Sequence, residues 1–202
     1  MTTENNFDSD LDTLRNSLQY FCRIVLNSAN FYYGTGVNLF LSMGGNLAKE
    51  PFSFSPKVNS LFKDQSKRPL APIRIALLSA KNIQLQRALE QATDAITRSS
   101  DAGLHCYRAI EAIRRDFLNG KADEGSAKKK SWTDMNNSLK LTQAFYSLIK
   151  THADVSRHGG LKDITSPEME DILHKTWAII DRYLVYLNSG RKPLDHSYPE
   201  LN

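Results

Sequence analysis

The stretch THADVSRHGG, residues 151–160, holds the side chains of this sequence that are best suited to phosphate chemistry. Arg157 can grip a phosphate through two parallel hydrogen bonds. His158 can move a proton at neutral pH, because the ordinary pKa of histidine is about 6.5. An arginine and a histidine are the minimum for cleaving RNA through its own 2′-hydroxyl without a metal ion. We therefore predict Arg157 and His158 as the candidate catalytic residues, with Asp154 as a nearby ligand-binding residue.

The same stretch also has a purely structural interpretation. Cations near the C-terminus of a helix face the negative end of its dipole, and a pair of glycines can end the helix. Arg157 and His158 are adjacent in the chain and can point in different directions. Phosphate binding and proton transfer at one site could therefore require residues from two chains of a dimer. The sequence leaves the structural and the catalytic interpretations open.

A second polar group lies in HCYRAIEAIRRDF, where three basic side chains fall opposite the apolar stripe of a predicted helix. Most such charges form a solvated face. A carboxylate at the border of the stripe, Glu111, could instead orient Arg157 from the neighbouring helix. The candidate ligand-binding residues on this helix are therefore His105, Arg108, Glu111 and Arg115.

Four amphipathic segments are expected to position these residues, because apolar side chains recur at spacings of three and four over about 82–98, 101–118, 132–151 and 165–188. Asn82 is a candidate N-cap, and Asn119-Gly120 supplies a left-handed stop. Residues 120–131 lack an apolar anchor and are expected to form an exposed, mobile connection. Short links between such helices predict an antiparallel four-helix bundle over 81–190, followed by a tail over 191–202.

The first 80 residues are less regular. YFCRIVL at 20–26 and VNLFLS at 37–42 suit strands, and PIRIALL at 72–78 suits a buried strand or the start of a helix. Helical spacing is also present, in Leu11, Leu14, Leu18, Phe21 and Val25. We predict a mainly α protein with a smaller N-terminal α+β region over 1–80, while an all-helical N-terminal region remains the alternative.

The composition is that of an ordinary globular protein, with 41% hydrophobic and 24% charged residues and no apolar run of membrane-spanning length. The first residues are polar and acidic, unlike a secretory signal, so we expect a cytoplasmic protein that does not bind a membrane. A net charge of +4 permits binding to a polyanion. Cys22 and Cys106 lie in apolar segments and are expected to be small core residues. The five histidines lack metal-site spacing, so we expect no metal and no cofactor.

Residues 82–188 resemble the HEPN superfamily of helical-bundle proteins. The resemblance rests on the helix LHCYRAIEAIRRDF with Glu111 at its centre, a later helix opening on SWTDM, and RHGG before a well-capped last helix. It implies a bundle of four to five helices that commonly dimerises, and its active members are metal-independent ribonucleases of defence, toxin–antitoxin or RNA-processing systems. The nuclease motif of the family has a histidine after four to six residues beyond the arginine, where this chain has Lys162, Asp163 and Ile164. The resemblance therefore implies that Arg157 contacts phosphate or a nucleotide, and it does not identify His158 with the histidine of the family.

These observations predict a cytoplasmic, homodimeric, HEPN-like protein that binds RNA or a nucleotide in a groove between subunits. Binding alone is the favoured activity of such a site, and metal-independent RNA cleavage is the less favoured one. The alternative is a non-enzymatic interaction or regulatory module with a protein partner, in which the polar cluster is structural.

Overall fold

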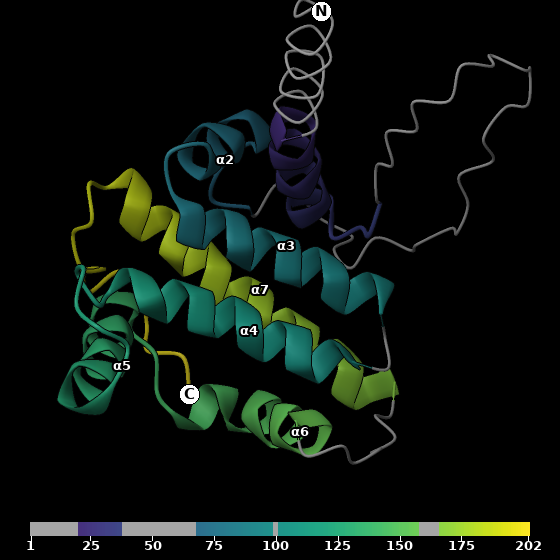
Figure 1. The fold of residues 1–202 in the computed structure, drawn as a ribbon. Coiled ribbons are helices and arrows are strands. Elements are labelled where there is room, and N and C mark those ends of the chain that lie inside the picture. The colour runs from purple at the N-terminus through teal and green to yellow at the C-terminus, as the bar shows by residue number, and fades with distance from the viewer. Residues whose placement is uncertain (1–19, 38–67, 99–100, 158–165) are drawn as a thin grey trace, which may run out of the picture.

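The computed structural model describes residues 20–37, 68–98, 101–157 and 166–202, except for the side chains of Ser156, Arg157 and Ser166. This part of the chain is mainly helical, as predicted, and it contains no strand (Figure 1). Residues 20–33 form a helix. The elements that follow are α2 (Pro72–Ser79), α3 (Ile83–Thr97), α4 (Ala102–Asp116), α5 (Gly125–Leu139), the short 3-10 helix η3 (Ala144–Tyr146), α6 (Ser147–Arg157) and α7 (Ser166–Asn188).

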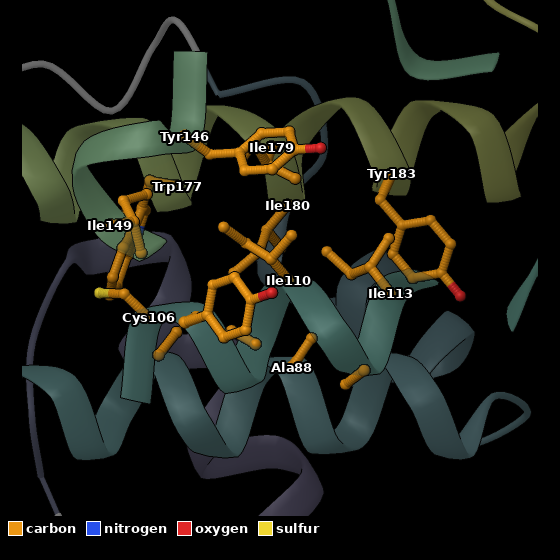
Figure 2. Close-up of a cluster of buried hydrophobic side chains, with 14 of the residues drawn as sticks. Ala88, Cys106, Ile110, Ile113, Tyr146, Ile149, Trp177, Ile179, Ile180 and Tyr183 are labelled. Carbon is orange, nitrogen blue, oxygen red and sulfur yellow. The ribbon is translucent and has the colours of Figure 1, made fainter. Parts of the chain in front are cut away.

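Helix α4 lies at the centre of the described fold and packs against α3, α6 and α7. Ile110 and Ile113 of its apolar stripe are fully buried. Figure 2 shows these side chains meeting Ile149 of α6 and Ile180 of α7 in one cluster. Burial of such side chains from water is the main favourable term in folding, so this cluster holds the helices together. On α3 the buried positions include three alanines, Ala88, Ala92 and Ala95, which allow a close approach to α4.

The helix ends predicted from local signals are confirmed. The side-chain oxygen of Asn82 accepts hydrogen bonds from the backbone N–H groups of Gln84, at 2.9 Å, and Leu85, at 3.0 Å. After α4, Asn119 and Gly120 have φ values of 52° and 79°, the left-handed conformation expected for a helix stop. Helix α7 begins within one residue of the predicted Thr165 boundary.

The expected mobile connection over 120–131 is wrong from Gly125 onward, because α5 begins there rather than near Trp132. A buried arginine of α4 holds this segment. Arg114 donates to Asp123 at 2.6 Å and to the hydroxyl of Ser131 at 2.9 Å. These hydrogen bonds join polar groups of different elements. The spacing of apolar residues therefore gives no indication of them.

The predicted helix over 132–151 is interrupted. The interruption lies where the C-terminal tail contacts the chain. Lys140, at φ 55°, ends α5 in the left-handed conformation, and Leu141 forms an isolated bridge with Leu201. The side chain of Arg182 on α7 donates to the carbonyl oxygens of Leu139, at 3.0 Å, and Lys140, at 2.9 Å. Carbonyl groups at the end of α5 therefore find partners outside the helix, and the tail is an integral part of the fold.

The strand interpretation of YFCRIVL is wrong, since residues 20–26 belong to a helix, and 72–78 is the helix α2 rather than a strand. The 20–33 helix is anchored on α7. Phe31 stacks on Trp177 with 5.6 Å between ring centroids, and the Trp177 Nε1–H donates to the Phe31 carbonyl oxygen at 2.9 Å. Of VNLFLS, residues 38–42 lie outside the described part of the chain.

The two cysteines differ in environment. Cys106 is buried in the core, as expected, whereas the expected burial of Cys22 is wrong, because this residue lies exposed on the 20–33 helix. Among the described helices, none is both long and apolar enough to cross a bilayer.

Candidate functional site

The ligand-binding residues predicted on α4 do not form one cluster. His105 and Arg115 are ten residues apart, which corresponds to about 15 Å along the helix axis. Arg108 and Arg115 are exposed and Glu111 is half-buried, so these three follow the predicted polar face. His105 is only 5% exposed, and its expected place on that solvated face is wrong.

His105 lies between α4 and α3. Its Nδ1 is 2.9 Å from the side-chain oxygen of Gln91 and 4.0 Å from a carboxylate oxygen of Asp94. Burial lowers the pKa of this imidazole, which outweighs the opposing effect of Asp94. His105 is therefore neutral at neutral pH and joins the two helices through a hydrogen bond.

Helix α6 is anchored through His152 near its middle, and this side chain is buried. A Cβ atom added to Gly103 would lie 2.6 Å from the Cβ of His152, so the backbones of α4 and α6 are in close contact at this point. The His152 Nε2 lies 3.9 Å from a carboxylate oxygen of Glu168 on α7. Asp154 is half-buried and Arg157 ends α6, while His158 lies outside the described residues.

The expected contact between Glu111 and Arg157 is not possible within one chain. Helices α4 and α6 run antiparallel, and Gly103 and His152 mark where they touch. Glu111 lies eight residues beyond Gly103 in one direction, and Arg157 lies five residues beyond His152 in the other. At about 1.5 Å per residue the two are separated by about 20 Å along the axes, more than two extended side chains can bridge.

A surface cleft of about 750 Å³ lies at the C-terminal end of α4, away from Gly103. It is formed by the start of α3, the end of α4, the turn that follows α4, and the start of the tail. We call it the basic cleft, and its lining residues are Ile83, Gln84, Arg87, Arg115, Asp116, Leu118, Asn119, Gly120, Lys121, Asp123 and Arg191.

One wall of the basic cleft is organised by Asp116. Its Oδ2 accepts a hydrogen bond from the hydroxyl of Tyr183 at 2.8 Å, and Arg191 binds both carboxylate oxygens. Asn82 donates to the Tyr183 oxygen at 3.1 Å. Burial, and after it the adjacent carboxylate, raise the pKa of Tyr183, so the phenol remains protonated. The charge of Asp116 is therefore matched by Arg191.

The other wall is organised by Asp123. It accepts hydrogen bonds from Arg114 at 2.6 Å and from Arg115 at 3.2 Å. The hydrogen bond from Arg114 is the main reason why the pKa of Asp123 is lowered. Arg114 itself is buried and lies over the ring of Trp132, with 5.5 Å to the centroid. Asp123 is thus ionised and fully compensated by two guanidinium groups.

The lining contains four cationic and two anionic side chains, an excess of two positive charges. Both carboxylates are engaged by guanidinium groups, whereas Arg87 and Lys121 have no acidic partner within the described residues. Such a surface favours an anion, phosphate above all.

The described ranges contain no group of three or more histidine, cysteine, aspartate or glutamate side chains that could hold a metal ion.

Sequence reasoning identified one cation of the basic cleft, Arg115, and missed Arg87, Lys121 and Arg191. These residues come from three separate elements, and no periodicity links them. The available signal was positional, because Lys121 directly follows the Asn119-Gly120 stop and Arg191 directly follows Gly190. Cations placed just after helix ends are a weak indication that they meet in space.

No curated protein and no solved structure matches the chain. The family model described as the C-terminal domain of a domain of unknown function (DUF8168) matches residues 70–188. This span includes α2 through α7 and every lining residue of the basic cleft except Arg191. Since the match covers more than half of the sequence, the chain belongs to the DUF8168 C-terminal domain family.

Proposed function

We propose that this protein is a HEPN-like RNA- or nucleotide-binding protein that holds phosphate in the basic cleft. The observation that carries the proposal is the pair Arg87 and Lys121, two cations without an acidic partner in the described part of the chain, in a cleft that also presents Arg115 and Arg191. A volume of about 750 Å³ is within the range of pockets that take small-molecule ligands.

The HEPN-like part of the proposal concerns the helical arrangement. In this proposal α3, α4, the α5–α6 segment and α7 correspond to the four helices of an antiparallel bundle. The order of these helices, and the packing of α4 against α3, α6 and α7, support the assignment. The cytoplasm, where RNA and nucleotides are abundant, is the proposed location.

Binding in the basic cleft would use the cations in different ways. Arg115 presents a planar guanidinium that can contact two phosphate oxygens, and Lys121 supplies a compact point charge. Arg191 is already oriented by Asp116, so it adds a fixed positive potential. Release of counterions from RNA makes such binding weaker at higher salt.

RNA cleavage, if the protein performs it, is assigned to the α6 end. In that reaction Arg157 neutralises the scissile phosphate and His158 transfers the proton. Because Glu111 is about 20 Å from Arg157 within a chain, it would have to orient Arg157 of a second chain in a homodimer. A metal-independent ribonuclease of this kind would fit a role in defence or in a toxin–antitoxin pair.

A binding assay tests the basic cleft. Fluorescence anisotropy of labelled single-stranded RNA, with a nucleotide as competitor and EDTA present, would compare the wild type with the double variant Arg87→Ala/Lys121→Ala. The matched control is Lys128→Ala/Lys129→Ala, which removes the same charge from exposed positions of α5. We expect the cleft variant to bind at least about tenfold more weakly, equivalent to about 1.4 kcal/mol, and the control to bind like the wild type.

Two results would contradict the assignment. Equal losses in both double variants mean that binding depends on net charge alone, and absence of binding by the wild type removes the basis for the proposal. The same mixtures report cleavage, which Arg157→Ala and His158→Ala should each abolish if the α6 end is catalytic.

A second candidate function is a non-enzymatic interaction or regulatory module that binds a protein partner. It is favoured by the exposed apolar side chains Phe21, Val25, Ile73 and Leu77 on the 20–33 helix and α2. A wild-type protein that neither binds nor cleaves RNA would support this module over the nucleic-acid-binding protein.

A further inference from the structure

One side-chain oxygen in the basic cleft lacks a hydrogen-bond donor. It belongs to Gln84, a half-buried residue in the first turn of α3 that lines the cleft. This oxygen is enclosed and has no hydrogen-bond partner among the described residues. A buried acceptor without a donor costs free energy, so such groups are uncommon in folded proteins. The last torsion of a glutamine side chain is soft, and rotation about it would turn the oxygen toward a donor that enters the cleft.

A nonpolar side chain lies next to this amide in the sequence. Ile83 is the first residue of α3, lines the same cleft and is 53% exposed. Exposed nonpolar surface in a cleft favours a ligand with a nonpolar part, because contact removes that surface from water. Inorganic phosphate and simple sugar phosphates have no such part. The basic cleft therefore offers a nonpolar contact and an amide in addition to its cations.

The spacing along α3 places these contacts within reach of one small molecule. Arg87 lies four residues after Ile83 and three after Gln84, so it shares a helix face with both, at about 5–6 Å between Cβ atoms. Lys121, in the turn after α4, lines the same cleft. The arrangement suits a ligand in which a short linker joins an anionic group to a flat, polar-edged ring. A nucleotide has this chemistry, since its sugar joins a phosphate to a base.

Among the bases, adenine complements the amide of Gln84 most fully. A glutamine amide presents an acceptor beside a donor. Adenine carries its amine, N6, between two ring nitrogens that accept hydrogen bonds, N7 and N1, so the amide can pair with the base on either side of N6. Glutamine reads N6 and N7 of adenine in DNA for the same reason, whereas guanine presents two acceptors, O6 and N7, at that edge.

We propose that the basic cleft binds an adenine nucleotide. The base packs on Ile83 and its amine donates to the side-chain oxygen of Gln84, while the phosphate lies between Arg87 and Lys121. This inference rests on the proposed function, because it specifies the ligand of the same cleft. It adds Gln84 as the residue that selects the base, whereas the cations supply affinity without selecting it. The nucleotide can be free or one unit of an RNA strand, since both present the same groups.

Isothermal titration of the full chain at low salt, with EDTA present, tests the reading of the base. Adenosine 5′-monophosphate should bind about fivefold or more tightly than purine riboside 5′-monophosphate, which is the same molecule without the amine. In Gln84→Leu this preference should disappear. The matched control is Gln86→Leu, at a half-buried glutamine of the same helix that does not line the cleft, and it should keep the preference of the wild type.

Three results overturn the inference: no binding of adenosine 5′-monophosphate by the wild type, equal binding of the two nucleotides, or an unchanged preference in a Gln84→Leu variant that circular dichroism shows to be folded. Ribose 5-phosphate separates such a failure from failure of the proposed function. If it binds the wild type and not Arg87→Ala/Lys121→Ala, the cleft holds phosphate even where the base is not read.

Hexaadenylate, titrated in the same way, distinguishes the two sources of the nucleotide. Binding tighter than that of adenosine 5′-monophosphate identifies an RNA strand as the ligand, because further units of the strand then make contacts of their own. Binding no tighter than that of the monomer identifies a free nucleotide.

Discussion

Tyr183 on α7 donates its phenolic hydrogen to Asp116 at the end of α4, with 2.8 Å between the two oxygens. Arg191 from the tail binds the same carboxylate, so one acidic side chain connects two helices and the tail. Asn82, which caps α3, donates to the Tyr183 oxygen and brings a third helix into the network. The wall of the basic cleft is therefore part of the packing of the fold, and its geometry depends on contacts that also stabilise the protein.

Replacing Tyr183 by phenylalanine should lower the free energy of unfolding by about 1–3 kcal/mol, because a buried hydrogen bond to a carboxylate is lost and Asn82 loses its acceptor. Urea unfolding followed by circular dichroism measures the change. Tyr198→Phe, at a half-buried tyrosine of the tail, is the matched control and should change stability by less than about 0.5 kcal/mol. Similar losses in both variants would show that the hydroxyl of Tyr183 contributes nothing specific.

Replacing Gly103 by alanine should destabilise the α4–α6 contact. The new methyl group would lie 2.6 Å from the Cβ of His152, so the helices must move apart. Overpacking of this kind costs about 1–3 kcal/mol, which outweighs the higher helix propensity of alanine, worth about 1 kcal/mol. Thermal unfolding provides the measurement, and an increase in Tm would show that α6 does not pack on α4 at this point.

Acidification should remove part of the stability of the protein through His105. Burial lowers its pKa in the folded state, so the folded chain binds fewer protons than the unfolded chain. The contribution of His105 is therefore present above the ordinary value of 6.5 and is lost as the pH falls from there towards the lowered pKa. His105→Gln should reduce this dependence when urea unfolding is measured between neutral and mildly acidic pH.

The control for this experiment is His174→Gln, at an exposed histidine of α7, which should keep the pH dependence of the wild type. An unchanged pH dependence in His105→Gln would mean that other groups control the acid sensitivity.

The two cysteines should react with a thiol reagent at very different rates. Cys22 is exposed, whereas Cys106 is fully buried and burial raises the pKa of its thiol to about 12. The thiolate is the reactive form, so a colorimetric disulfide reagent should modify one thiol rapidly in the native protein and two after denaturation. Cys22→Ser should abolish the rapid reaction and Cys106→Ser should leave it unchanged. Rapid modification of both thiols in the native state would be inconsistent with the packing of α4.

Signals that act over a few residues predicted α3, α4 and α7 well. The Asn82 cap, the Asn119-Gly120 stop and the apolar stripe of α7 each depend on neighbours within one or two helical turns. The start of α5 and the break at Lys140 could not be found in this way. The hydrogen bonds that fix them come from Arg114, from Arg182 on α7 and from Leu201 in the tail. The strand predicted over residues 20–26 is a helix, and the sequence pattern is ambiguous there because nonpolar residues of this helix face both the core and the solvent.

For the candidate site, the sequence by itself determined that the chain is mainly helical, that cations accompany the polar face of α4, and that Arg115 is one of them. Only the tertiary structure decided that His105 turns into the protein, that Glu111 and Arg157 lie far apart within a chain, and that Arg87, Lys121 and Arg191 meet Arg115 in one cleft. The physical reason is the separation in sequence over which each kind of interaction acts. Helix hydrogen bonds and caps join residues within about four positions of each other, whereas a charged cleft is assembled from side chains that only the packing of whole helices brings together.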